Sequence, residues 1–391
     1  MDAAQLARLH EVRPFPAVSI IMPTHRARPE RQQDRIRLKV LLDEARQRLT
    51  EYELDHGVAD EVMRTLEKAA EQVDFERPAD ALVLFAAYGG ENHAFVLPGV
   101  SVSERVIIDD TFATRDLLAM LERTWKYYVL VVSEEPTRLL AGEGERVTEV
   151  TNALFPLTLD GTVPETEGGP TPLNRVRDRI QEDRRQQFVR QIETNLGELL
   201  KRDARPVIAV GVNRSLVYLR EYSANGTLKE ALIGTVEGAY EKATPPEIAR
   251  LVAPVLREEN ARIREEALAE IDEAKSRKRF AGGLEECWEL AHQGRIAHLL
   301  VEDTYFAPSR THEGRLQVLS EGGAIEAGVP PIPEVELGHN QEATDEAFRG
   351  RFVNDAVDDL IEAVLRADGR ASFVPDGSLA DYHRVAATLR Y

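Results

Sequence analysis

The spacing of apolar residues along the chain predicts alternating strands and helices. Residues 17–22 form a short apolar run that ends at Pro23, which is typical of a buried strand. After a polar loop, apolar residues recur at helical spacing from Leu38 to Leu49, and a second helix is predicted over 58–73. Further strands are predicted at 81–87, 93–97 and 105–108, with a helix over 114–125. This alternation favours sheets flanked by helices.

A second region begins with a strong strand pattern at 127–133. A turn at Pro136 leads into another predicted strand at 137–140, and 147–154 is a candidate third strand. Residues 160–172 contain three glycines and three prolines among few apolar residues, so we expect an exposed loop. The rest of this region is predicted to hold a long helix over 174–201, strands at 206–212 and 217–221, and a charged helix over 245–278.

The last region starts near Arg279. A helix through Cys287 is expected to stop at Gly294, and a buried strand follows at 296–301. The segment 304–346 is rich in Gly, Pro and Glu, which indicates an insertion. The end of the chain is predicted to hold a helix over 354–367 and strands at 371–375 and 386–391. We therefore predict an α/β chain of three domains, with mixed sheets flanked by helices, at 1–125, 126–278 and 279–391.

Composition limits the classes of partner. The 391 residues are 43% hydrophobic and 30% charged, which is enough for packed cores, and the formal net charge is −19. A uniformly basic nucleic-acid-binding surface is therefore excluded, so any RNA contact must come from a local basic patch. The acidity also argues against binding to an anionic membrane. We expect no membrane partner and a monomer.

Cysteine and histidine usage narrows the chemistry. The single cysteine, Cys287, cannot form an internal disulfide or a cysteine-rich zinc site, which fits a reducing cytoplasm. Residues 1–14 lack the apolar core of a signal peptide, and no apolar run reaches the ~18 residues that span a bilayer. The histidines lack metal-site spacing and no phosphate-binding loop motif is present, so we expect no metal and no cofactor. Ser19, Thr24 and His25 lie close in sequence, but that closeness does not make a catalytic triad.

The most informative stretch is EGGPTPLNRVRDRI at 167–180. Gly168 and Gly169 stand in the predicted long loop, where a glycine backbone can approach a partner closely. Three acids interrupt the basic residues that follow, and composition alone favours a solvated helix, although a helix that is polar all round also suits a polar partner. The arginines of this helix are Arg175, Arg177, Arg179, Arg184, Arg185 and Arg190.

A second basic cluster lies at MPTHRARPERQQDRIRLK, residues 22–39. In a chain of net charge −19, this local excess suggests a surface that faces phosphates. The alternative is a basic helix N-terminus whose charges are paired with acidic neighbours such as Glu30 and Asp34. The candidate RNA-binding residues of this cluster are His25, Arg26, Arg28, Arg31 and Arg35.

These motifs, in their order, resemble a known family. The succession of strand-turn-strand, long loop, Gly-Gly, arginine-bearing helix and strand resembles the middle domain of archaeal and eukaryotic release factors. There, a GGQ tripeptide precedes a long helix with spaced arginines and a later aromatic, as Arg175, Arg179, Arg185 and Phe188 are spaced here. The closing RVAATLRY and the strand in GRIAHLLVED resemble the third domain of the same proteins. The block at 19–45 is similar to the bacterial archaeo-eukaryotic-type release factors.

The resemblance implies a ribosome-binding factor, with one departure. Pro170 stands where the catalytic Gln of GGQ belongs, so the chain looks like the non-hydrolysing side of the family, which includes Pelota-type rescue factors and Balon-type hibernation factors. The latter occupy the vacant ribosomal A site with elongation factor Tu as a partner; here that factor or another translational GTPase is implied. The first domain shows no NIKS-type stop-codon signature. Two alternatives stay open: a peptidyl-tRNA hydrolase that uses a replacement for Gln, and an RNA-binding regulatory protein that never contacts ribosomes.

Overall fold

The structure, a computed structural model, describes most of the chain. The described residues are 5–6, 8–9, 15–52, 54–75, 79–124, 126–134, 136–159, 172–222, 226–312, 315–318, 351–353 and 355–391, with the backbone alone at 28–29, 172–179, 181, 222, 312 and 351–352. They form two compact units. Unit 1 combines Met1–Arg123 with Arg264–Tyr391, and unit 2 is Thr124–Ile263. No helix among the described residues is long and apolar enough to cross a membrane.

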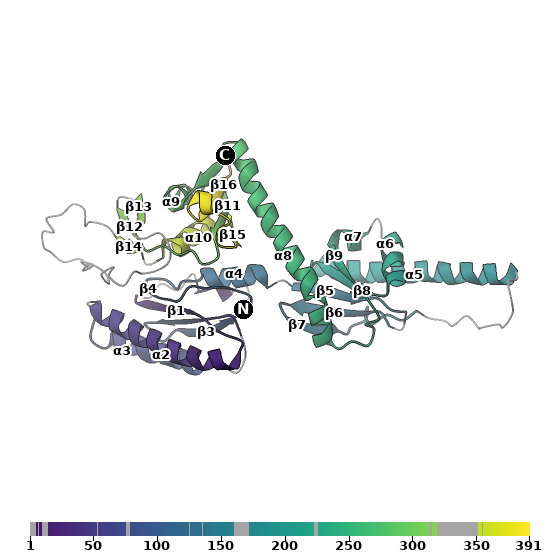
Figure 1. Cartoon of the computed structure of the whole chain (residues 1–391), viewed down its shortest axis with the longest axis horizontal. Coiled ribbons are helices and arrows are strands. Elements are labelled where there is room, and N and C mark those ends of the chain that lie inside the picture. The colour runs from purple at the N-terminus through teal and green to yellow at the C-terminus, as the bar shows by residue number, and fades with distance from the viewer. Residues whose placement is uncertain are drawn as a thin grey trace. The chain divides into compact units, whose positions relative to one another are not determined.

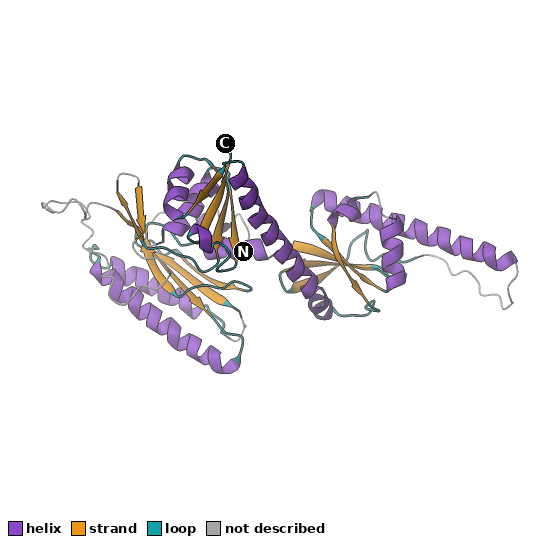
Figure 2. Cartoon of the chain, turned by 45° about the horizontal axis from the view of Figure 1, so that its top comes forward, coloured by secondary structure: helices purple, strands orange, loops and turns teal. Residues whose placement is uncertain are grey.

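The N-terminal part of unit 1 is a four-stranded sheet with two helices on one face (Figures 1 and 2). The strand order is β3-β2-β1-β4, and all pairs are antiparallel. On β1, Val18 and Ile20 face the two helices, whereas Ala17 and Ile21 face the opposite side, as strand alternation requires. The elements are β1 (Ala17–Pro23), α2 (Arg28–Glu51), α3 (Val58–Glu71), β2 (Ala81–Ala87), β3 (Asn92–Leu97), β4 (Arg105–Asp109) and α4 (Arg115–Arg123).

The C-terminal part of unit 1 holds a second sheet with helices on both faces. Its order is β10-β16-β11-β15, with β11 and β15 parallel and the other pairs antiparallel. Leu299 on β11 belongs to the core that α9 and α10 cover, whereas Leu300 packs toward Ile271 of α8. The elements are the second half of α8 (Pro245–Ser276), β10 (Phe280–Gly282), α9 (Leu284–His292), β11 (Ile296–Glu302), α10 (Ala356–Arg366), β15 (Arg370–Val374), the 3-10 helix η2 (Ala380–Tyr382) and β16 (Val385–Leu389).

One hydrophobic core joins the two parts of unit 1. It contains Phe85 and Phe112 from the N-terminal part, whose rings stack with centroids 4.7 Å apart, together with Leu299 and Leu360 from the C-terminal part. Cys287 lies in the same core, and burial raises the pKa of its thiol. The two parts therefore share buried apolar surface, which is the main stabilising contribution to a folded unit.

Unit 2 is a five-stranded sheet with helices on both faces (Figure 2). The order is β7-β6-β5-β8-β9, in which β5, β8 and β9 are parallel. Along β5, Tyr128 and Leu130 face α5, α6 and α7, and Val129 faces α8. The elements are β5 (Lys126–Val131), β6 (Arg138–Glu143), β7 (Arg146–Val150), α5 (Pro172–Arg202), β8 (Val207–Gly211), α6 (Asn213–Tyr222), α7 (Thr227–Ala231), β9 (Leu232–Glu237) and the first half of α8.

Most of the predicted elements are present, and the α/β class with sheets flanked by helices is confirmed. The predicted strand at 217–221 is wrong, because these residues belong to helix α6. The polar loop before Leu38 is also wrong in part, because α2 already begins at Arg28. The predicted insertion contains the strands β12 (Ser309–His312) and β13 (Arg315–Val318), which form a three-stranded sheet with β14 (Arg351–Val353).

The division into three domains stays a prediction. The chain passes between the two compact units at residues 123–124 and 263–264. The boundaries predicted from the sequence lie near residues 125 and 278.

Candidate nucleic-acid interface

The predicted site in unit 2 lies on α5, whose two halves differ in what they contact. The second half packs into the core through Phe188, Ile192 and Leu196. Among the side chains described before Phe188, Ile180 is 42% exposed and none belongs to a core cluster. The core contacts of the second half therefore fix the helix in the fold. The first half makes no such core contacts through its described side chains, as expected for a helix that presents a polar surface.

Arg185 is fixed at the junction of these two halves. Its Nε donates to Glu134 Oε1 over 2.8 Å, and its guanidinium carbon lies 5.9 Å from the centre of the Tyr218 ring. The Tyr218 hydroxyl in turn donates to Glu182 Oε2 over 2.9 Å. Arg214 approaches the same ring, at 5.6 Å. These contacts brace α5 against α6 and the end of β5, so part of the positive charge of Arg185 is neutralised within the protein.

The other predicted residues of this helix are only partly described. Arg184 is half-buried on α5. The backbone of the predicted Arg175, Arg177 and Arg179 belongs to α5, but their side chains lie outside the described residues. The Gly168-Gly169-Pro170 tripeptide also lies outside the described residues, between 159 and 172.

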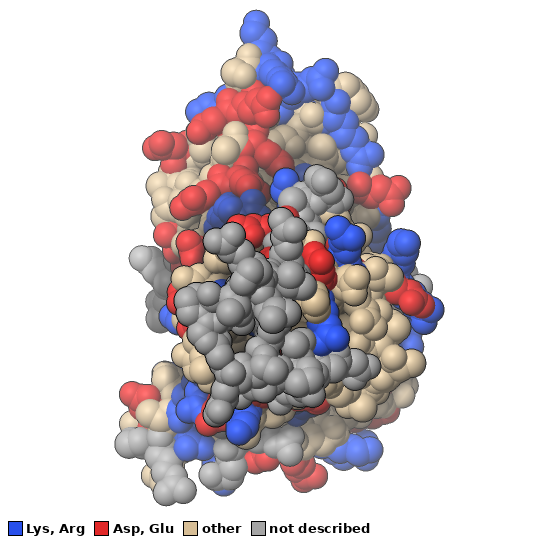
Figure 3. Space-filling model, turned by 90° about the vertical axis from the view of Figure 1, so that its right-hand side faces the viewer, with Lys and Arg blue, Asp and Glu red and all other residues tan. Residues whose placement is uncertain are grey.

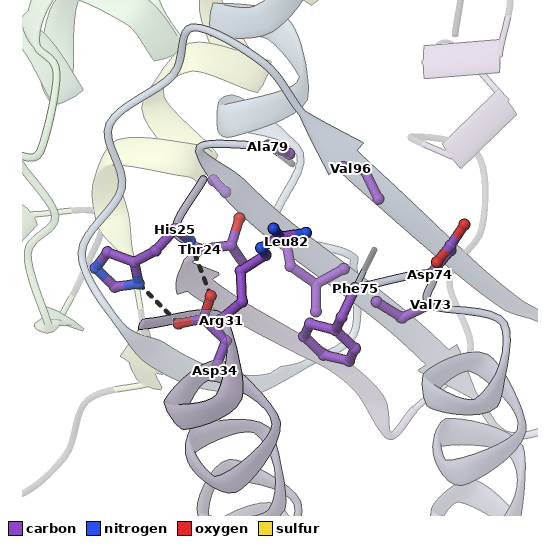
Figure 4. A pocket seen from close by; sticks show the side chains of 11 residues that line it. Thr24, His25, Arg31, Asp34, Val73, Asp74, Phe75, Ala79, Leu82 and Val96 are labelled. Carbon is purple, nitrogen blue, oxygen red and sulfur yellow. Dashed lines mark hydrogen bonds and ion pairs between the residues drawn. The ribbon is translucent and has the colours of Figure 1, made fainter. Parts of the chain in front are cut away.

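The predicted site in unit 1 lies where β1 leads into α2. The Asp34 carboxylate is buried and holds His25 twice: the His25 backbone N–H donates to Oδ2 and the imidazole Nδ1 lies 2.8 Å from Oδ1 (Figure 4). The His25 side chain itself is 39% exposed. A buried carboxylate thus fixes the orientation of an exposed imidazole.

Arg26 is paired inside the protein as well. Its Nε and Nη2 donate to the two oxygens of Asp80 over 2.9 and 2.7 Å, a bidentate geometry. The hydrogen bond from Arg26, with a further one from the Gly99 backbone N–H, keeps the pKa of Asp80 below its ordinary value. Arg26 therefore tethers the end of β1 to the start of β2, and much of its charge is matched by this carboxylate.

The remaining residues of this cluster point to different surroundings. The guanidinium of Arg35 lies over the Phe75 ring, 5.5 Å from its centre. Arg31 lines a hollow together with Thr24 and Phe75. The side chain of Arg28 lies outside the described residues. The Ser19 hydroxyl is buried and accepts a hydrogen bond from the Ala113 N–H, whereas His25 is held by Asp34.

In each cluster, one described arginine is paired with a carboxylate, which offsets part of its charge. The carboxylates that pair with them, Glu134 and Asp80, lie 51 and 54 positions away in the chain from Arg185 and Arg26. Figure 3 shows basic and acidic side chains interspersed over much of the face viewed. Among the described residues, no group of three His, Cys, Asp or Glu side chains could hold a metal ion. The prediction that these two clusters face phosphates stays a prediction.

With this geometry established, the comparisons with known proteins show what the chain is similar to. Residues 126–295, which include nearly all of unit 2, match the family model for bacterial archaeo-eukaryotic release factor family 3. This stretch is thus similar in sequence to that family. The resemblance to the bacterial archaeo-eukaryotic release factor family that the sequence predicted is confirmed. No functionally curated protein sequence matches the chain.

Three archaeal structures are among those to which the chain is similar. The crystal structure of an archaeal translation termination factor is 16% identical, with 100% of this chain and 99% of that chain covered and a TM-score of 0.25. Archaeoglobus fulgidus Pelota is 15% identical, with 79% of each chain covered and a TM-score of 0.34. Archaeal Pelota from a model of its ribosome-bound complex with ABCE1 is 12% identical, with 99% and 94% covered and a TM-score of 0.40.

Proposed function

We propose that the chain is a cytoplasmic translation factor that binds the A site of idle or stalled ribosomes, for hibernation or rescue, without releasing the peptide. The observation that carries this proposal is the family match at 126–295, because that stretch contains the long arginine-bearing helix α5. A translational GTPase, elongation factor Tu or another, is the proposed delivering partner on the family resemblance alone.

The arrangement of α5 supports contact with ribosomal RNA. Its second half is buried against the sheet of unit 2, and Arg185 is braced by Glu134 at 2.8 Å. The arginines that precede this brace, from Arg175 to Arg179, therefore stand on a helix whose base is fixed in the fold. A preorganised basic helix loses little conformational freedom when it meets phosphates, which favours binding.

The absence of peptide release follows from the residue after Gly168-Gly169. A third residue with a backbone N–H and a carboxamide can hold the attacking water and stabilise the charge that develops on the leaving group. Pro170 has no backbone N–H and no carboxamide. Binding without hydrolysis is the function that this residue favours.

Sedimentation with purified ribosomes tests the proposal. The full chain is mixed with ribosomes whose A site is vacant and, separately, with ribosomes whose A site holds a tRNA. We expect the chain to pellet with the vacant ribosomes and to be displaced by the bound tRNA. Equal pelleting with both samples would place the binding site elsewhere, and binding to free RNA without any binding to ribosomes would favour the regulatory alternative.

A further inference from the structure

Basic side chains gather at one end of the C-terminal sheet of unit 1, outside both clusters that the sequence indicated. They come from the segment after α8, the residue before β11, the first residue of β15 and the residue after β16. Lys and Arg side chains predominate at the top of Figure 3, where in Figure 1 α8 ends and the C-terminus lies. We call this group the basic end, and its members are Arg277, Lys278, Arg279, Arg295, Arg370 and Arg390.

Backbone hydrogen bonds hold the segments of the basic end side by side. The Leu389 N–H donates to the carbonyl oxygen of Arg279 over 2.9 Å, and the Arg390 N–H donates to the carbonyl oxygen of Arg295 over 3.0 Å. Because β11 and β15 are parallel neighbours, the start of β15 at Arg370 also lies beside the start of β11. The sheet therefore fixes the places from which these basic side chains extend.

Much of the charge of the basic end is not matched within the protein. Arg277 pairs with Glu273 over 2.6 Å and Arg370 with Glu270 over 3.4 Å, and both arginine side chains stay exposed. Asp368, two positions before Arg370, lowers the local excess further. Within the described part of the chain, no Asp or Glu forms an ion pair with the other four members, Lys278, Arg279, Arg295 and Arg390. In a chain of net charge −19, this end therefore stands out as a place for an anionic partner.

An exposed aromatic ring lies within the same group. The Tyr391 residue is 68% exposed, and the guanidinium carbon of Arg295 lies 5.4 Å from the centre of its ring. Arg295 Nη2 also donates to the backbone oxygen of Tyr391 over 3.2 Å, so the arginine and the ring are held together. Surfaces that bind single-stranded nucleic acid combine cations, which meet the phosphates, with aromatic rings on which the bases stack. The basic end offers both kinds of group.

We propose that the basic end binds single-stranded RNA, with phosphates on Lys278, Arg279 and Arg390 and a base against the Tyr391 ring. Cations spread along the end of a sheet suit a chain of phosphates better than one small anion, because several of them can be met at once. All members but Lys278 are arginines, which bind a phosphate through two parallel hydrogen bonds. An acidic protein segment would use the cations but not the ring. The proposal rests on the proposed function only for the source of the RNA, which would be the ribosome.

Fluorescence anisotropy tests the basic end without ribosomes. The probe is a fluorescein-labelled uridine oligonucleotide, and the protein is the full chain. Lys278→Gln with Arg279→Gln should weaken binding about tenfold and flatten the slope of log binding constant against log salt by roughly 1.4, because two phosphate contacts are lost. The matched control is Arg46→Gln with Lys68→Gln, which removes the same charge from exposed positions of α2 and α3 in the same unit and should have little effect.

Two further comparisons separate stacking from charge and this surface from α5. Tyr391→Leu should weaken binding about fivefold because one stacking contact is lost, and it should leave the salt slope unchanged. The charge variants are also made in a chain that carries Gln at the three positions 175, 177 and 179. Because the basic end and α5 belong to different units, the loss caused by Lys278→Gln with Arg279→Gln should have the same size in this background.

The proposal is overturned if the variant at Lys278 and Arg279 binds the oligonucleotide as tightly as the control variant, or if Tyr391→Leu binds like wild type. Polyglutamate that displaces the probe as well as unlabelled oligonucleotide does would point to an acidic protein partner and overturn it too. Thermal melting of each variant verifies that it is folded. Failure of these tests with normal ribosome sedimentation would leave the proposed function intact, whereas their success without ribosome binding would reject that function and keep the basic end.

Discussion

The backbone N–H of Arg115 donates a hydrogen bond to the Asp358 carboxylate over 2.8 Å and thereby joins α4 to α10. These residues are 243 positions apart and belong to the two parts of unit 1. Arg115 and Asp358 are both buried within a larger ionic cluster. In this cluster Arg105 contacts Asp116, and Arg105 and Arg115 each lie within 4 Å of Asp355. Burial, together with the nearby Asp355, raises the pKa of Asp358 well above its ordinary value.

Removing one member of this cluster should destabilise unit 1. Asp116→Asn takes away the charge that Arg105 contacts and leaves the two buried guanidinium groups of Arg105 and Arg115 with Asp355 as their nearby carboxylate, which costs about 3–5 kcal/mol. Calorimetry should show a lower transition temperature for unit 1. The matched control is Glu198→Gln, which breaks an exposed pair with Arg202 and should cost less than about 1 kcal/mol. Equal effects of the two changes would mean that the buried cluster contributes no more than a surface pair.

Glu122 should give unit 1 a measurable dependence on pH. Burial raises the pKa of Glu122 to about 7, although it accepts hydrogen bonds from the Ser372 hydroxyl and the Phe373 N–H. Because the folded pKa lies above the ordinary 4.5, the stability contribution is full below about pH 4.5 and is lost as the pH rises to about 7. We expect the urea midpoint of unit 1 to fall across this window, by up to about 3 kcal/mol in unfolding free energy.

The Glu122→Gln variant should flatten this part of the pH profile. Asp303, whose pKa is also raised by burial, keeps part of the dependence. The control is Glu289→Gln, at an exposed position of α9, which should leave the wild-type profile unchanged. A Glu122→Gln profile that is as steep as the wild-type profile between pH 4.5 and 7 would rule out this assignment.

The salt dependence of ribosome binding should identify the arginines that meet phosphates. Each phosphate contact steepens the slope of log binding constant against log salt by roughly 0.7–0.9. Arg175→Gln, Arg177→Gln and Arg179→Gln together should weaken binding and flatten this slope. The matched triple variant Lys201→Gln, Arg202→Gln and Lys229→Gln removes the same charge elsewhere in unit 2 and should have little effect. If both triple variants gave the same salt dependence of ribosome binding, the first half of α5 would be a solvated surface that contacts no phosphates.

Arg185 should behave differently from these arginines. It is held by Glu134 and lies over Tyr218. We therefore expect Arg185→Gln to weaken ribosome binding because it loosens the packing that positions α5, and not because a phosphate contact is lost. Glu134→Gln should then weaken ribosome binding in the same direction, although it makes the protein less acidic. A gain in binding for Glu134→Gln would instead mean that Arg185 contacts RNA directly once it is released.

The chain should not release peptides from tRNA. Loss of one preorganised hydrogen-bond donor costs about 10²–10³ in rate, and Pro170 removes both the N–H and the carboxamide of a GGQ loop. The measurement is release of labelled peptide from ribosomes with peptidyl-tRNA in the P site and an empty A site. We expect background rates for the wild-type chain. Release well above background that Gly169→Ala abolishes would establish the hydrolase alternative.

Limited proteolysis should cut the chain near residues 125 and 278. The first position is close to the passage between the units at 123–124, and the second follows the end of α8 at Ser276. After both cuts, the N-terminal and C-terminal fragments should co-elute in gel filtration, because they share one hydrophobic core and the Arg115–Asp358 hydrogen bond. Their separation under native conditions would show that each folds alone.

Local sequence patterns predicted the central strands, the long helices and several edge strands, but not every edge strand. The runs at β1, β2 and β11 are buried, so their apolar content marks them in the sequence. The segment around Val217 has β-prone residues but forms α6, because Leu216 and Leu219 reach the core at helical spacing. The edge strand β9 was missed, since it is only half-buried and contains Gly234.

The sequence indicated the candidate residues of the site but not their surroundings. The arginines were visible in the sequence, but their partners were not, because Glu134 and Asp80 pair across long stretches of chain. Asp34 was counted as an opposing charge, whereas it is the buried carboxylate that orients His25. Val73 and Phe75 are brought to Thr24 only by the tertiary fold, so no local pattern marks the hollow that Arg31 lines.

The placement of the only sulfur nucleophile has a practical consequence. Cys287 is the single cysteine of the chain, and it is buried with a thiol whose pKa is raised, so it should resist alkylating dyes. The wild-type chain is then a ready background for spectroscopy. Cysteines introduced at the exposed positions Ile180 in unit 2 and Tyr88 in unit 1 would carry a donor and an acceptor dye. Energy transfer between them would compare the distance between these two positions with and without ribosomes, one molecule at a time.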